Sequence, residues 1–193
     1  RMRKYIRQKR KEEKDTLAHQ VPELKKLQKM VTEYDSRLYE MSPEDEDFLQ
    51  VSLGFYSGQS QFKVECKLDE LATEEDELAE EAKQIVQDFE VIHGIPMTVN
   101  LRNEHLGIVG EKENLHNQLK YLLAQLCFFN SYHDLQIVFI SNEAYASKFG
   151  YLRWYPHLRI QSINVIAGIF TESMRDQILG SILQVIKDRK QKA

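Results

Sequence analysis

The fold of this chain is decided by residues 105–142, which read HLGIVGEKENLHNQLKYLLAQLCFFNSYHDLQIVFISN. The apolar pattern predicts a strand over 106–109, a turn at Gly110, a helix over 114–129 and a second strand over 137–140. P-loop nucleotidases hold phosphate on this same order of strand, glycine turn, helix and strand. Two buried parallel strands of any other α/β domain would give the same pattern, so both interpretations stand at this point.

The residues that bind phosphate in a P-loop are missing from this segment. With Gly110 as the first glycine of G-x-x-x-x-G-K-[ST], the glycine, lysine and hydroxyl residue that should follow are replaced by Leu115, His116 and Asn117. Leucine does not readily adopt positive φ, and a mostly neutral histidine is too short to follow a β- or γ-phosphate. Glu111 and Glu113 add negative charge where the anion would lie. We therefore interpret this segment as a degenerate P-loop.

The position of a Walker B motif is altered as well. Ser141 and Asn142 follow the second strand, where a Walker B motif carries the carboxylate that holds Mg²⁺. Glu143 comes one place late, with no aspartate before it. The sequence therefore predicts no catalytic residue, no bound nucleotide and no metal in this chain. The alternative is a weak or atypical nucleotidase that uses Lys112 and Glu143.

Length and composition suit a globular domain with an appendage. The chain has 193 residues, of which 42% are hydrophobic, and no apolar run approaches the length of a membrane span. The cysteines, Cys66 and Cys127, are far apart and show no C-x-x-C spacing, which fits core thiols in a reducing compartment. The histidines show no ligand spacing for a metal either.

The charge is distributed unevenly. The net charge is −4, yet residues 1–14 hold eight basic and two acidic residues, a net charge of +6 that leaves −10 on the remainder. Such a basic end indicates nucleic acid, an anionic membrane surface or only a solvated helix. Because the chain starts on Arg1 rather than Met, we expect a fragment, in which residues 1–14 could lie just cytoplasmic of a transmembrane helix.

The rest of the chain predicts a three-layer α/β sandwich behind a helical stalk. Residues 1–42 are expected to form the basic stalk and connector: an exposed helix over 1–18 with little reason to pack, then a helix whose stripe (Leu24, Leu27, Met30 and Val31) docks on the body. Residues 43–193 are expected to form the α/β domain, with a mostly parallel sheet and one antiparallel edge hairpin from Phe48 to Lys67.

Smaller elements complete this prediction. A helix should start at Thr73, with Asp76 completing a capping box, and should end at the segment Gly94–Pro96. Strands are expected over 97–101 and 164–170. Thr171 should cap a last helix with an inward face formed by Met174, Ile178, Ile182 and Val185.

An aromatic segment follows the second strand of the central unit. Beside Arg153 and Arg159, its aromatic rings could stack bases, or they could form a hydrophobic flap over the sheet, which the few basic neighbours favour. His157 has no nearby cysteine or acid that would make it catalytic. As candidate contacts to a partner or a neighbouring domain we single out Phe149, Arg153, Trp154, Tyr155 and His157.

Three stretches carry a resemblance to a known family. The EssC/EccC proteins, membrane-bound FtsK/SpoIIIE-type ATPases of bacterial type VII secretion, contain D-x-R-L-[WY]…D-x-D-F-L-x-[VY]-x-[VL]-G, then G-[IL]-P…[VN]-L, then W-L-[KR]-W-[LY]-P-H. The residues similar to these motifs are Asp35, Arg37, Leu38, Tyr39, Asp45–Phe48, Val51, Leu53, Gly54, Ile95, Pro96, Leu101, Arg102, Leu152, Arg153, Trp154, Pro156 and His157. The resemblance runs from about Lys4 to Lys190. It departs at Tyr155, where leucine is common, and at Phe149, where tryptophan often stands.

The resemblance implies a place and a role. The matching region of the family lies between the transmembrane helices and the first ATPase module, and it resembles an ATPase module without nucleotide motifs. It implies a non-catalytic coupling domain at the cytoplasmic face of the membrane, with ATP and Mg²⁺ bound only in other modules of the parent. The implied partners are the following ATPase modules, other type VII secretion components and a possible homo-oligomer. No nucleic acid is expected, although a nucleic-acid module of an FtsK-like translocase is an alternative.

Overall fold

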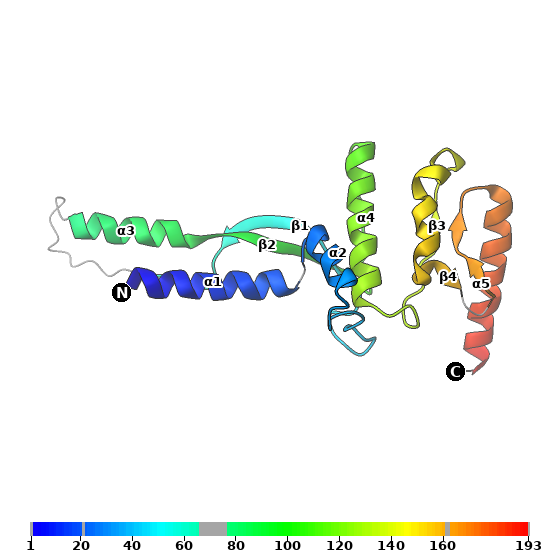
Figure 1. Ribbon diagram of the computed structural model, residues 1–193, viewed down its shortest axis with the longest axis horizontal. Coiled ribbons are helices and arrows are strands. Elements are labelled where there is room, and N and C mark those ends of the chain that lie inside the picture. Colours follow the sequence, from blue (N-terminus) through cyan, green and yellow to red (C-terminus); the bar gives the residue numbers. More distant parts are fainter. Residues whose placement is uncertain (1, 21, 66–76, 161–162, 193) are drawn as a thin grey trace. The chain divides into compact units, whose positions relative to one another are not determined.

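A computed structural model of the chain describes residues 2–20, 22–65, 77–160 and 163–192 (Figure 1). The chain forms two compact units, residues 1–32 with 49–124 and residues 33–48 with 125–193. The predicted boundary between residues 42 and 43 therefore falls inside the second unit. Within the described residues, no helix combines the length and the apolar character that crossing a bilayer requires.

The first unit is built on an antiparallel hairpin of two long strands. β1 (Gln50–Gln59) pairs with β2 (Val91–Asn100), from Gln50 opposite Asn100 to Gln59 opposite Val91. The predicted return strand over Phe62–Lys67 is wrong for residues 62–65, which form no strand, and residues 66–67 lie outside the described residues. The local return was predicted from a nearby turn, whereas the observed ladder joins segments separated by α3 (Glu77–Glu90). The segment Gly94–Pro96, expected to end a helix, lies within β2 instead, and the strand expected over 97–101 is its second half.

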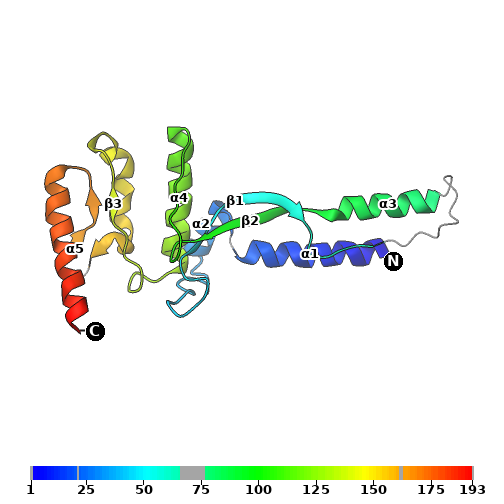
Figure 2. The ribbon, with the colours of Figure 1, turned by 180° about the vertical axis from the view of Figure 1, so that it is seen from behind.

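The first helix, α1 (Met2–Gln20), packs on this hairpin, contrary to the expectation of an unpacked helix. Figures 1 and 2 show α1 running beside β2 and α3. Ile6 is buried on that side. The Arg10 guanidinium donates hydrogen bonds to the carbonyl oxygens of Phe89, at 2.7 Å, and Val91. Glu13 accepts hydrogen bonds from the Ser60 hydroxyl at 2.6 Å and from the backbone N–H of residue 61 at 2.7 Å. A strongly polar helix is thus held by polar contacts that its sparse apolar pattern did not predict.

The second helix docks as its apolar stripe predicted. In α2 (Leu24–Thr32), Leu27 and Met30 are buried whereas Val31 is 51% exposed. The Tyr121 hydroxyl of α4 (Lys112–Phe129) donates a hydrogen bond to the Pro22 carbonyl oxygen at 3.3 Å, just before α2. In α3, four apolar residues at helical spacing are each partly buried: Ala82, Ile85, Val86 and Phe89. The expected cap at Thr73 and Asp76 lies outside the described residues.

The second unit combines short strands with a terminal helix. β3 (Phe139–Ile140) pairs in parallel with β6 (Gly168–Ile169), and β4 (Arg159–Ile160) pairs antiparallel with β5 (Val165–Ile166). Along the chain, the 3₁₀ helices η1 (Glu143–Trp154) and η2 (Pro156–Leu158) lie between β3 and β4. The helix α5 (Glu172–Lys192) begins where predicted, because the Met174 N–H donates a hydrogen bond to the Thr171 hydroxyl. One cluster of its core consists of Ile160, Ala167, Ile169 and Ile178, with Ile163, Val165, Ile182 and Val185 packed against them.

A mixed α/β fold is confirmed, but the described residues do not form a three-layer sandwich. Their strands occur in three two-stranded sheets. Residues 106–109, the strand expected to lead into Gly110, form none, and Val109 is fully exposed. Within the described part of the chain, no backbone hydrogen bond joins 106–109 to another segment. Because a strand is stable only when its N–H and C=O groups are paired, an apolar run interrupted by Gly107 and ended by Gly110 does not make one alone.

Candidate functional site

The degenerate P-loop lacks the shape of a phosphate cradle. The helix α4 begins at Lys112, so only Glu111 separates it from Gly110, where a P-loop has four residues between its glycines. The Leu115 N–H donates a hydrogen bond to the Glu111 carbonyl oxygen at 2.9 Å, as part of the first turn of the helix. His116 and Asn117 follow within α4. From Leu115 on, the backbone at this position therefore belongs to an ordinary α-helix and not to a loop that wraps a phosphate.

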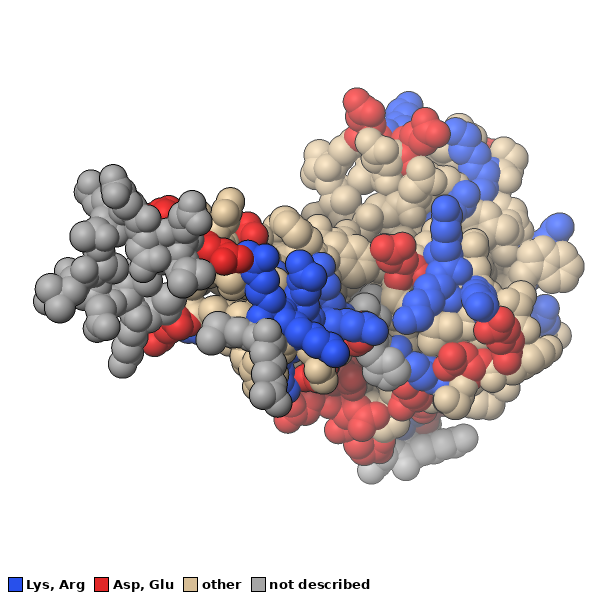
Figure 3. Space-filling view, turned by 60° about the vertical axis from the view of Figure 1, so that its left-hand side comes forward, with Lys and Arg blue, Asp and Glu red and all other residues tan. Residues whose placement is uncertain are grey.

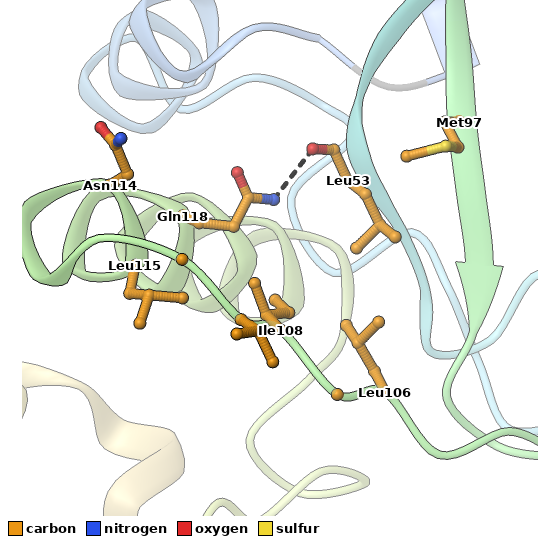
Figure 4. Close-up of a pocket in the computed structure, with 10 residues that line it drawn as sticks. Leu53, Met97, Leu106, Ile108, Asn114, Leu115 and Gln118 are labelled. Carbon is orange, nitrogen blue, oxygen red and sulfur yellow. Dashed lines mark hydrogen bonds between the residues drawn. The ribbon is translucent and has the colours of Figure 1, made fainter.

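The cavity beside this segment has a predominantly apolar wall. It measures about 430 Å³ and is lined by Leu53, Met97, residues 106–110, Asn114, Leu115 and Gln118. Figure 4 shows the Gln118 side chain directed at β1, where its amide donates a hydrogen bond to the Leu53 carbonyl oxygen at 2.9 Å. The described residues that line this cavity include no lysine or arginine. A triphosphate bound there would lack the cations that phosphate sites use.

The Walker B position is occupied by groups with structural partners. The Ser141 N–H donates a hydrogen bond to the Ile169 carbonyl oxygen at 3.0 Å, which extends the pairing of β3 with β6. The Asn142 side chain accepts a hydrogen bond from the Ala144 N–H at 2.9 Å and so caps η1. Both belong to the second unit, whereas Gly110 and residues 115–117 belong to the first. Among the described residues, no three potential ligands gather as a metal site would need.

The aromatic segment packs largely as a hydrophobic flap. The Phe149 ring lies 4.6 Å from that of Phe139 in β3, centroid to centroid. Tyr155 is half-buried, and burial raises its pKa. Trp154 is different, because 76% of it is exposed, with the Arg153 guanidinium 5.0 Å from its ring. Of the five predicted contact residues, Arg153 and Trp154 are therefore the two that are exposed to solvent.

His157, the fifth of them, lies inside the second unit. Only 1% of it is exposed, and its Nε2 lies 2.8 Å from the Asn130 carbonyl oxygen. Because a carbonyl only accepts, Nε2 carries the proton of the neutral ring. The Tyr39 and Tyr132 rings pack around it at 6.1 and 6.2 Å. Burial lowers the pKa of His157, with the Asn130 hydrogen bond opposing that effect. This environment is that of a structural histidine.

A second group of residues, which the sequence singled out only through the family resemblance, also has a structural task. The Arg37 N–H donates a hydrogen bond to the Asp35 carboxylate at 2.9 Å, and the Arg37 side chain forms an ion pair with Glu40. The Tyr39 N–H donates a hydrogen bond to the Phe128 carbonyl oxygen at 2.8 Å. The first two contacts order the connector itself, and the third attaches it to the end of α4. The buried Asn130, whose carbonyl oxygen accepts the hydrogen bond from His157, belongs to none of these motifs, and the sequence did not indicate its role.

The chain is similar to a small part of several longer proteins. No family model matches it. It is 31% identical to the ESX secretion system protein YukB of Bacillus subtilis and 28% identical to the ESX secretion system protein EccC of Geobacillus thermodenitrificans, over 96% of this chain and 13% of each relative. It is 28% identical to the type VII secretion system protein EssC of Staphylococcus aureus, over 91% of this chain and 12% of that protein. The chain is thus homologous to a region of these type VII secretion proteins.

Proposed function

We propose that this chain is a non-catalytic coupling and regulatory domain of a type VII secretion motor. It would link a membrane-proximal stalk, residues 1–42, to ATPase modules elsewhere in the same protein. Homology to a small region of EssC, EccC and YukB supports the assignment to type VII secretion. One observation supports the non-catalytic role above all: α4 starts directly after Gly110 and Glu111, so the described residues at this position form no loop around a phosphate.

The proposal assigns partners and a location. The chain would lie at the cytoplasmic face of a bacterial membrane, and its partners would be the following ATPase modules, other secretion components and copies of itself. ATP and Mg²⁺ would bind in those other modules. A three-layer α/β sandwich, which needs strand pairing over residues 106–109, is the arrangement we expect in the whole protein. Slow hydrogen exchange of those amides there would support it.

Titration calorimetry with Mg-ATP tests the absence of a nucleotide site. We expect no heat of binding for the chain of residues 1–193, because no cationic side chain is among the described residues that line the cavity beside Gly110. The Lys112→Ala variant serves as the matched sample. Binding at micromolar strength that the wild type shows and this variant loses would overturn the proposal.

The second candidate, an atypical nucleotidase, rests on Lys112. It is the first residue of α4, and a helix N-terminus favours anions. Its proposed partner Glu143 is exposed at the start of η1, in the other unit. Steady-state ATP hydrolysis measured on the wild type and on the single variants Lys112→Ala and Glu143→Gln decides between the two candidate functions. Turnover by the wild type that each single substitution abolishes would establish the nucleotidase.

A further inference from the structure

The orientation of α1 about its own axis is fixed by its contacts. Ile6, Arg10 and Glu13 face the hairpin, where Ile6 is buried and the two charged side chains make the hydrogen bonds described above. Arg3 adds an ion pair with Glu81 of α3. At about 100° per residue, the three hairpin-facing positions fall within about 60° of one another around the helix. The remaining circumference of α1 is therefore presented in a defined direction.

A row of basic side chains occupies a separate arc of that circumference. We call Lys4, Arg7, Lys11 and Lys14 the basic stripe; all four are exposed. They fall within about 80° of one another around the axis and extend about 15 Å along it. Figure 3 shows basic side chains gathered in a block on this part of the molecule. The stripe is thus a straight line of positive charge that the fold holds in place.

The other basic residues of α1 at positions 3, 9 and 10 are already engaged. Lys9 forms an ion pair with Glu12, which also accepts a hydrogen bond from the Gln8 side chain. Arg3 and Arg10 are bound to α3 and to the start of β2. Among the described residues, by contrast, no carboxylate pairs with any member of the basic stripe. Asp15 is the exposed acid nearest to the stripe around the helix, and it leaves the net charge there strongly positive.

We propose that the basic stripe binds the anionic phospholipid headgroups of a membrane surface, with α1 lying along that surface. This inference deepens the proposed position beside a membrane and rests on it. A plane of headgroups can contact all four members at once, because they lie on one arc of a single helix. Each basic residue near an anionic bilayer strengthens binding by about fivefold.

Nucleic acid fits the same charges less well. Single strands bind on aromatic platforms, and the aromatic residue nearest in sequence, Tyr5, is turned away from the stripe and packs edge-on with Phe62 at 6.4 Å. A duplex presents a curved rather than planar array of phosphates, and a polyanion longer than the stripe would also meet the remaining net charge of −10.

Vesicle flotation with the full chain tests the inference. The probes are phosphatidylcholine vesicles with or without about a quarter phosphatidylglycerol, at an ionic strength of about 0.1 M. We expect the wild type to bind only the anionic vesicles. The variant K4Q/R7Q/K11Q/K14Q should lose roughly a hundredfold in binding or more. The charge-conserving variant K4R/K11R/K14R should retain it, which separates loss of charge from loss of folding.

The matched control removes as much charge elsewhere. The variant K25Q/K187Q/R189Q/K190Q changes four exposed basic residues outside α1 and should bind within about threefold of the wild type, because none of them belongs to the basic stripe. The inference is overturned if the wild type ignores anionic vesicles, if both quadruple variants weaken equally, or if duplex DNA is bound while vesicles are not. None of these results bears on Mg-ATP binding, so the two proposals fail separately.

Discussion

At the scale of single residues, His157 connects the stability of the second unit to pH. Burial lowers its folded-state pKa below the ordinary 6.5, so the unfolded chain takes up the proton more readily. Stability is therefore complete above pH 6.5 and falls as the pH drops from 6.5 toward the folded pKa. We expect the urea midpoint at pH 5.5 to lie below that at pH 7.5.

The His157→Gln variant isolates this effect. Its amide can still donate to the Asn130 carbonyl oxygen but has no proton to gain in this range. The variant should be less stable than the wild type at pH 7.5, since glutamine fills the site less well, yet its midpoint should change less between the two pH values. A wild-type slope that survives intact in the variant would assign the pH dependence to other groups.

Cys127 provides a second residue-level prediction. The thiol is buried at the end of α4, and burial raises its pKa to about 12. Because the thiolate is the reactive form, native Cys127 should resist a thiol reagent such as DTNB. In a Cys66→Ala background, we expect no labelling of the folded chain and one equivalent after addition of denaturant. Stoichiometric labelling within seconds under native conditions would contradict the buried position.

At the scale of elements, the docking of α2 can be tested by two apolar truncations on one helix. Leu27 is 1% exposed and Val31 is 51% exposed. Leu27→Ala should therefore lower the free energy of unfolding by about 2–5 kcal/mol, because it removes buried apolar volume and leaves a cavity. Val31→Ala should change it by less than about 1 kcal/mol. Chemical denaturation measures both, and equal effects would mean that the helix is not docked through Leu27.

Helices were more predictable than strands for a physical reason. The apolar spacing of Leu27 and Met30, or the Thr171 cap, is local information that a helix satisfies with its own hydrogen bonds. A strand needs a partner, and its location is not local. The sequence placed the partner of β1 at Phe62–Lys67, although β2 lies beyond α3. For the same reason residues 106–109 had the composition of a strand but form none among the described residues.

The sequence shows which P-loop residues the candidate site lacks, but it did not predict the backbone conformation of the site. Missing lysine and hydroxyl residues at 116 and 117 are visible in the sequence, and so is the missing aspartate at 141. The early start of α4, which removes the loop, was not, because Lys112 and Glu113 are equally acceptable in a loop and in a first helical turn. The burial of His157 depends on Asn130, which is 27 residues away.

At the scale of the whole molecule, the charge distribution predicts poor binding of nucleic acid. Outside residues 1–14 the chain carries a net charge of −10, which repels phosphate backbones. We expect no gel shift of duplex or single-stranded DNA at physiological salt with the chain at about 10 µM, which lies within the range of ordinary non-specific affinity. A salt-dependent shift that disappears on deletion of residues 1–14 would instead support the nucleic-acid alternative.

The pairing of Gln59 with Val91 leaves the two ends of residues 60–90 one strand spacing apart, about 4.8 Å. Such a junction tolerates insertions and deletions, because doubling a loop between fixed ends costs only about 0.6 kcal/mol of closure entropy. The contacts of α1 with residues 60–90 include Ser60, which lies next to the junction, and Glu81, which lies in α3. Homologous secretion proteins can accordingly be expected to vary in length between those anchor points, while the hairpin itself keeps its register.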